Sequence, residues 1–86
     1  MKIVTTDKYD KKYKKLSNNL KDKIDRALEK FAKDPFDPSL LNHGLQGGLN
    51  GFNSIKAGFD LRIILKEENG YILVLLIDLG KHDHVY

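Results

Sequence analysis

The chain has 86 residues, an apolar fraction of 41%, no cysteine and a formal net charge of +3. A chain of this length supports one small core, so residues 1–86 are predicted to form a single domain. Without cysteine, disulfides and thiolate metal sites are excluded. No apolar stretch approaches the roughly 20 residues of a membrane span, and the N-terminus lacks the apolar core of a signal peptide. These features predict a cytoplasmic protein without a membrane partner.

The positive charge is concentrated in the first third of the chain. Residues 1–31 contain ten Lys and Arg against five Asp and Glu, a net charge of +5, whereas residues 32–86 carry −2. A basic segment can attract nucleic acid or an acidic protein. The same lysines would also suit the solvated face of a helix, and the pattern is consistent with either interpretation.

The first half of the chain predicts a short strand followed by two helices. Residues 2–5 are β-prone, Thr6 or Asp7 can cap a first helix, and residues 17–19 end it and cap a second that runs to about residue 33. Apolar side chains at helical spacing mark the sides that face the core: Tyr9, Tyr13, Leu16, Leu20, Ile24, Ala27, Leu28 and Phe31. Prolines then end the second helix, and a glycine-rich connection follows over residues 34–51.

The second half predicts an antiparallel meander. Residues 52–57 read as a strand and Gly58 as a bend, and two apolar runs then flank Glu68-Asn69-Gly70. An Asn-Gly pair between apolar runs is a strong hairpin signal, because a type I′ turn needs positive φ at both central residues. The predicted fold class is therefore α+β, with two N-terminal helices packed on a three- to four-stranded, mainly antiparallel sheet.

A two-residue Asn69-Gly70 loop also fixes a register. Glu68 would face Tyr71, Arg62 would face Ile77 and Asp60 would face Leu79. Because side chains alternate along strands, one face is almost purely apolar and is expected to meet the helices: Leu61, Ile63, Leu65, Ile72, Val74, Leu76 and Asp78. The other face combines a charged end with an apolar strip, Leu73, Leu75 and Ile77. This strip is either a partner surface or is covered by residues 34–51 or the C-terminal tail.

Polar residues gather at the open end of this hairpin. The tail over residues 80–86 supplies Lys81, His82, His84 and Tyr86, and the predicted register brings Asp60 and Arg62 to the same end, with Lys56 nearby. Cleavage of RNA by its own 2′-hydroxyl needs a base, an acid and cations for the phosphate, and His, Arg and Lys supply these groups. The pattern is equally consistent with Arg62 paired to Asp60 or Asp78 beside a merely polar tail.

Other chemistries find little support. His82 and His84 are two residues apart and His43 is distant, which is weak evidence for a metal site. No serine lies in a nucleophile turn. We therefore predict no metal site and no cofactor.

Several short segments, in order, resemble a known family. These are His43-Gly-Leu-Gln-Gly47, Gly51-Phe52, Asp60-Leu-Arg62-Ile-Ile and Gly80-Lys-His82-Asp-His-Val-Tyr86, together with the Tyr- and Lys-rich start of the first helix. They resemble the RelE/ParE toxin superfamily of toxin–antitoxin systems, and within it the RelE-like and YafQ-like messenger-RNA interferases. The resemblance covers nearly the whole chain.

The resemblance implies a role for each matching residue. His43 matches the histidine of the glycine-rich loop that helps proton transfer, and Asp60 matches an aspartate before the central strand. His82 matches the histidine of the tail motif, the expected general acid, and Tyr86 the terminal aromatic that stacks on or orients the substrate. Arg62 matches the arginine that stabilises the phosphate. Further RNA contacts are expected from three other residues of the sheet and tail, Lys56, Lys81 and His84.

The chain also departs from the YafQ-like pattern. Asp78 stands where those proteins carry an arginine, Lys56 where they carry a histidine, and Leu61 where a tryptophan follows their aspartate. These departures concern the catalytic assignment rather than the fold.

The implied function is that of a type II toxin, a ribosome-dependent endoribonuclease that cuts messenger RNA and stops translation. The implied partners are the messenger RNA, the ribosome and a cognate antitoxin, with which the toxin can form a heterotetramer. Two alternatives stay open. One is a ParE-like toxin that binds and inhibits DNA gyrase without cutting RNA, and the other is an inactive relative that still binds an antitoxin.

Overall fold

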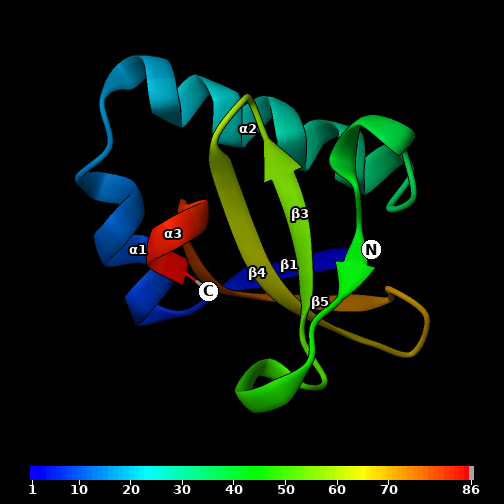
Figure 1. Cartoon of the computed structure of the whole chain (residues 1–86). Coiled ribbons are helices and arrows are strands. Elements are labelled where there is room, and N and C mark those ends of the chain that lie inside the picture. Colours follow the sequence, from blue (N-terminus) through cyan, green and yellow to red (C-terminus); the bar gives the residue numbers. More distant parts are fainter. Residues whose placement is uncertain (86) are drawn as a thin grey trace.

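The computed structural model describes residues 1–85 and shows one helix, α2, lying across a face of a five-stranded sheet (Figure 1). The strands are β1 (Lys2–Thr5), β2 (His43–Gly44), β3 (Asn53–Ala57), β4 (Leu61–Glu68) and β5 (Leu73–Lys81). The helices are α1 (Asp7–Lys14), α2 (Asn18–Lys33) and α3 (His82–Val85), and the connection after α2 contains two 3₁₀ turns, η1 (Pro38–Leu40) and η2 (Gly47–Leu49). The α+β class with two N-terminal helices is confirmed, and the sheet has one strand more than predicted because β2 forms within the connection.

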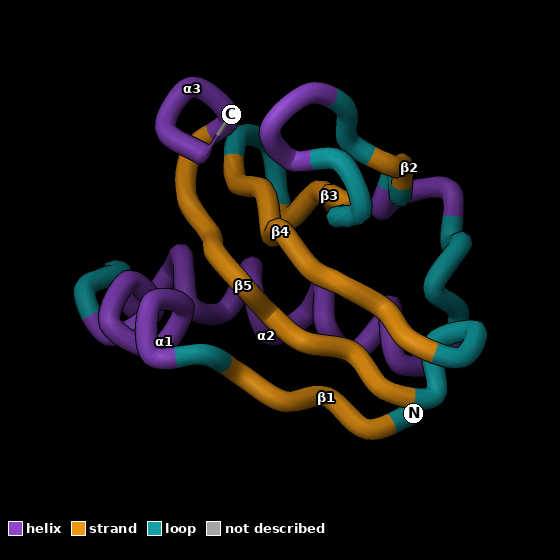
Figure 2. Tube along the Cα trace, turned by 90° about the horizontal axis from the view of Figure 1, so that it is seen from below, coloured by secondary structure: helices purple, strands orange, loops and turns teal. Residues whose placement is uncertain are grey.

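The strands follow the order β1-β5-β4-β3-β2 (Figure 2). The predicted meander of β3, β4 and β5 is confirmed, with antiparallel pairing throughout. β1 is an edge strand and lies parallel to β5, an arrangement that the long intervening chain, with α1, α2 and the other three strands, allows.

Both predicted helix caps are present. The Thr6 hydroxyl accepts a hydrogen bond of 3.3 Å from the Tyr9 N–H at the start of α1, and the Ser17 hydroxyl accepts one of 3.2 Å from the Leu20 N–H at the start of α2. Each oxygen satisfies a backbone donor that the first helical turn leaves unpaired. These bonds depend on residues three apart in sequence, which is why the sequence could specify them.

The core lies where the apolar sides of the helices meet the sheet. Leu61, Ile63 and Leu65 of β4 are buried, as predicted, and so are Val74 and Leu76 of β5. The rest of the cluster consists of buried Tyr9, Ile24, Ala27, Phe31, Leu40, Ile55, Ala57 and Leu79, with Leu16, Leu20 and Leu28 partly buried against it. The amphipathic pattern of α2 therefore identified its core-facing side correctly.

The predicted hairpin register is wrong. Glu68 pairs with Leu73 rather than Tyr71, so four residues connect the strands. Asn69, Gly70 and Tyr71 all have positive φ, between 55° and 69°. Tyr71 leaves the strand because its ring packs edge-on against Phe31, with the centroids 5.8 Å apart. A tertiary contact thus overrides the two-residue turn that Asn-Gly favours locally. As a result Ile72 is 66% exposed, although it was predicted to face the helices.

A β-bulge shifts the register again farther along β5. Leu65 pairs with Leu76 but Ile64 pairs with Asp78, so Ile77 is the extra residue. Beyond it Arg62 lies opposite Gly80 rather than Ile77. The bulge also explains why Leu79 belongs to the core and not to the open face, since one inserted residue moves every later side chain to the opposite face.

The C-terminal segment is more ordered than a polar tail. β5 continues to Lys81, and His82–Val85 form the short helix α3. On the face away from α2, the three strip residues Leu73, Leu75 and Ile77 are half-buried. Among residues 1–85, no helix combines the length and the apolar character that crossing a bilayer requires.

Candidate functional site

The centre of the candidate site is a pair of basic side chains on neighbouring strands. Lys56 of β3 lies opposite Arg62 of β4, which lies opposite Gly80 of β5. Directly opposed residues of antiparallel strands have Cβ atoms about 4.5–5.5 Å apart, so the two half-buried cations share one surface. Arg62 Nη1 donates a hydrogen bond of 3.0 Å to the Leu61 carbonyl. A guanidinium carries five N–H donors, so one bond does not exhaust its capacity for an anion.

Asp60 and His82 meet at the same end of the sheet. The His82 backbone N–H donates a hydrogen bond of 3.2 Å to the Asp60 carbonyl, which joins the start of α3 to the turn between β3 and β4. Both residues are exposed, as is Lys81, which lies opposite Leu61 at the end of the β4–β5 ladder. The predicted gathering of these residues at one sheet end is therefore present, although the register that led to it was wrong.

His43 approaches from the far edge of the sheet. It pairs with Ser54 of β3, two residues before Lys56, and strand alternation puts Ser54 and Lys56 on one face. The imidazole is exposed and its Nδ1 lies 2.8 Å from the Leu41 carbonyl oxygen. A carbonyl only accepts, so Nδ1 carries the proton, and Nε2 is the acceptor in the neutral ring.

The structure does not describe the side chains of two predicted site residues. Tyr86 lies beyond the described residues 1–85, and His84 is described only as part of the backbone of α3. Their predicted contacts with RNA stay predictions.

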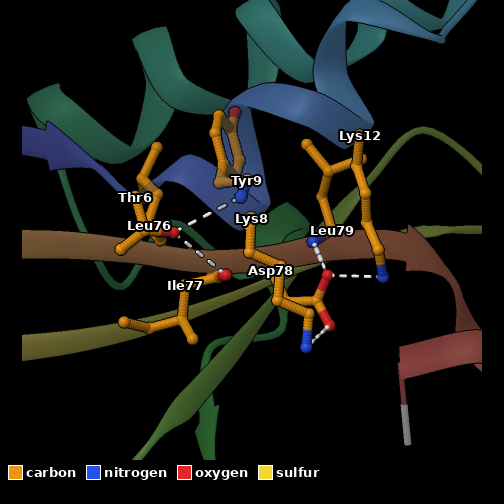
Figure 3. Close-up of polar contacts among 8 residues, drawn as sticks. All are labelled: Thr6, Lys8, Tyr9, Lys12, Leu76, Ile77, Asp78 and Leu79. Carbon is orange, nitrogen blue, oxygen red and sulfur yellow. Dashed lines mark hydrogen bonds and ion pairs between the residues drawn. The ribbon is translucent and has the colours of Figure 1, made fainter.

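The carboxylate of Asp78 is held by two lysines of α1 (Figure 3). Its carboxylate lies 3.2 Å from the Lys8 ammonium and 2.6 Å from that of Lys12, and it accepts a hydrogen bond of 2.8 Å from the Leu79 N–H. Burial alone would raise the pKa of Asp78, but the hydrogen bonds from the two lysines and from the Leu79 N–H outweigh it and lower the pKa. Asp78 therefore serves to attach α1 to β5, and the alternative in which it pairs with Arg62 is not what the structure contains.

The junction between β1 and α1 is fastened to the same strand. The Thr6 hydroxyl lies 2.9 Å from the Leu76 carbonyl oxygen and 3.2 Å from that of Ile77, at the bulge (Figure 3). Sequence reasoning missed this cluster. The one available signal was the spacing of Lys8 and Lys12, four residues apart and hence on one side of α1.

No protein-family model and no curated protein sequence matches the chain. Solved structures do match its fold. YafQ from E. coli strain BL21(DE3) superposes with a TM-score of 0.81 at 16% identity, covering 98% of this chain and 96% of that one. A YoeB/ParE toxin from Agrobacterium tumefaciens gives 0.78 at 19%, covering 95% and 99%. The intact E. coli RelBE toxin–antitoxin complex gives 0.70 at 16%, covering 93% and 94%. The chain thus has the fold of the RelE/ParE-like toxins, as the sequence motifs predicted.

Proposed function

We propose that this protein is the toxin of a type II toxin–antitoxin pair and that it cleaves messenger RNA on the ribosome. The observation that carries the proposal is the set of groups at one end of a toxin-like sheet. Arg62 and Lys56 lie side by side there, and the turn at Asp60 is hydrogen-bonded to the start of α3 at His82. This set contains the proton carriers and cations that phosphodiester cleavage requires.

In the proposed reaction the ribose 2′-oxygen attacks the adjacent phosphorus and the bond from phosphorus to the 5′-oxygen breaks. The products are a 2′,3′-cyclic phosphate and a 5′-hydroxyl. We assign the removal of the 2′-hydroxyl proton to His43, and the bond between its Nδ1 and the Leu41 carbonyl supports this because it leaves Nε2 as the acceptor. His82 is assigned as the acid that protonates the leaving 5′-oxygen. Asp60 would orient it from the neighbouring turn.

The remaining site residues bind the substrate. Arg62 and Lys56 would stabilise the negative charge that grows on the phosphoryl oxygens, Arg62 through paired N–H donors. Lys81 and His84 would add contacts to the RNA backbone, and Tyr86 would stack on a base.

The proposed protein partner is an antitoxin with an acidic segment. The net charge of +5 over residues 1–31 supports this, since an acidic chain is attracted to such a surface. RelBE from E. coli is a toxin–antitoxin complex of the same fold. We expect a cytoplasmic complex of toxin and antitoxin, with a heterotetramer as its form.

Induced expression tests the proposal. The wild-type protein should arrest growth and leave message fragments that end in 2′,3′-cyclic phosphate and 5′-hydroxyl groups, and co-expression of the neighbouring small gene should restore growth. Growth arrest with intact messages and inhibited gyrase would favour the ParE-like alternative. Normal growth in cells that contain folded protein would contradict a toxin altogether.

A further inference from the structure

A second cationic surface lies on the helix side of the turn between β3 and β4. A cavity of about 380 Å³ opens there between α2, η1 and the end of β3. Among the described residues its lining includes four cations and no carboxylate: Lys23, Arg26, Lys30 and Lys56. We call this space the α2 cavity. Such a concentration of positive charge favours an anionic ligand.

The nearby carboxylates hold these cations only weakly. Arg26 Nε lies 3.0 Å from Asp22 across one helical turn, and both side chains are more than half exposed. Exposed pairs of this kind contribute little to stability, so a phosphate can replace Asp22 at small cost. Lys30 Nζ donates a 3.4 Å hydrogen bond to the Ser39 hydroxyl, which donates to Asp37 at 2.7 Å.

The turn beside the α2 cavity packs against α2. Gly58 has φ +66°, and a Cβ at this position would lie 2.8 Å from Lys23 Cδ. The backbone therefore packs directly on the Lys23 side chain. The next residue, Phe59, is 87% exposed, and the Lys56 ammonium lies 6.0 Å from the centre of its ring. An exposed ring beside several cations provides a stacking surface for a nucleic acid base.

We propose that the α2 cavity and the Phe59 ring together form a second RNA-binding subsite, which continues the path of the substrate strand beyond Arg62. The cations bind phosphates and Phe59 stacks on a base. Lys56 joins the two sites, because it lies opposite Arg62 and also lines the α2 cavity. This inference rests on the proposed function in that the ligand is the same RNA. RNA is favoured over an acidic peptide because a peptide would engage the cations but gain little from the exposed ring.

A fluorescence titration tests the stacking contact. The chain contains no tryptophan, so Phe59→Trp introduces a single reporter at the subsite, and Phe36→Trp a matched reporter at another exposed phenylalanine. The probe is a short single-stranded 2′-O-methyl RNA, which cannot undergo attack by its 2′-oxygen. We expect saturable quenching of indole fluorescence in the Phe59→Trp variant and not in the Phe36→Trp variant. Equal responses of the two variants, or no response of Phe59→Trp, would overturn the subsite.

Phe59→Ala and two double variants test the energetics. Phe59→Ala should weaken binding of the same RNA about 5- to 150-fold, the range for loss of one stacked base. Lys23→Gln/Lys30→Gln should lower the slope of log affinity against log salt by about 1.4, because each lost phosphate contact removes about 0.7. Lys21→Gln/Lys33→Gln removes the same charge from the same helix outside the α2 cavity and should leave the slope nearly unchanged. Equal slopes for the two double variants would contradict the proposal.

A polyglutamate peptide tests whether the α2 cavity binds an acidic protein instead of RNA. The binding assay also tests the subsite independently of the proposed reaction. If the peptide binds in the α2 cavity and RNA does not, the surface serves an acidic protein and the RNA subsite is wrong. The titration uses uncleavable RNA, so binding that depends on Lys23, Lys30 and Phe59 supports the subsite even if cleavage fails. If these substitutions change neither cleavage nor the binding of uncleavable RNA, the reaction is supported and the subsite is rejected.

Discussion

The two ends of the β4–β5 ladder use their aromatic residues in opposite ways. At the connecting turn, Tyr71 packs edge-on against Phe31 and Phe36, with centroid separations of 5.8 and 5.3 Å, and its hydroxyl accepts a 3.0 Å hydrogen bond from Asn42. At the other end Phe59 is 87% exposed. The first arrangement stabilises the fold, since packed rings bury large apolar areas. The second contributes little to folding, so its aromatic and basic side chains remain available to a ligand.

The largest effect should come from the packed end. Phe31 is fully buried, and Phe31→Ala should lower the free energy of unfolding by about 3–5 kcal/mol through lost contacts and a cavity. Phe59→Ala should change it by less than about 0.5 kcal/mol, as for most surface substitutions. Urea denaturation of the two variants compares the ends directly, and similar losses would show that the contrast between them is false.

Gly58→Ala should have the next largest effect. The left-handed backbone at φ +66° opposes a side chain, whereas the Lys23 side chain can move aside, so we expect a loss of about 1–3 kcal/mol in the free energy of unfolding. Gly44→Ala is a matched control in β2, where an added Cβ meets no atom within 4 Å, and it should cost less. Thermal unfolding of both variants measures the difference, and equal melting temperatures would show that the left-handed backbone at Gly58 imposes no such cost.

Removing one hydroxyl at the packed end should have a smaller effect. Tyr71→Phe keeps the ring contacts but loses the hydrogen bond from Asn42, and one such bond contributes about 1 kcal/mol. The free energy of unfolding from urea titration should fall by that amount. A loss as large as that of Phe31→Ala would mean that the polar contact, and not ring packing, fixes the turn.

Asp78, between the two ends, should give the smallest effect and one that depends on pH. Its pKa is lowered in the folded protein, so its contribution is fully present above the unfolded pKa near 4 and is lost as pH falls through the folded pKa. Asp78→Asn should reduce stability at pH 7 by less than about 1 kcal/mol, because the Lys8 and Lys12 partners are substantially exposed. The difference between the variant and the wild type should shrink as pH falls below the unfolded pKa, which thermal unfolding across pH can check. A difference that grows on acidification would contradict this sign.

Local features of the fold could be predicted and contacts between distant residues could not. The caps at Thr6 and Ser17 and the apolar stripe of α2 depend on neighbours within a helical turn, and they are present as predicted. The predicted register is wrong for two reasons. Tyr71 packs against Phe31 instead of continuing the strand, and nothing in the apolar sequence around Ile77 indicates a bulge. Neither cause can be read from the sequence of the hairpin.

The candidate site shows the same division. The proximity of Arg62, Asp60 and His82 at one end of the sheet could be predicted, because any tight β4–β5 hairpin places them there whatever its register. It did not identify the α2 cavity, whose cations come from α2 and β3 and are assembled only by packing. Asp78 was ambiguous for the same reason, since its partners lie on α1, far away in the sequence.

The central claim is that the exposed end of the sheet performs RNA chemistry, and purified ribosomes programmed with a defined message test it most directly. The His82→Ala variant should cut the message roughly 10²–10⁴-fold more slowly than wild type, the usual contribution of a positioned proton donor. Arg62→Ala should cost about 10²–10³-fold through lost charge stabilisation, whereas Lys33→Ala on the exposed surface of α2 should cut at the wild-type rate. If folded His82→Ala and Arg62→Ala proteins both cleave as fast as wild type, the assigned site is wrong.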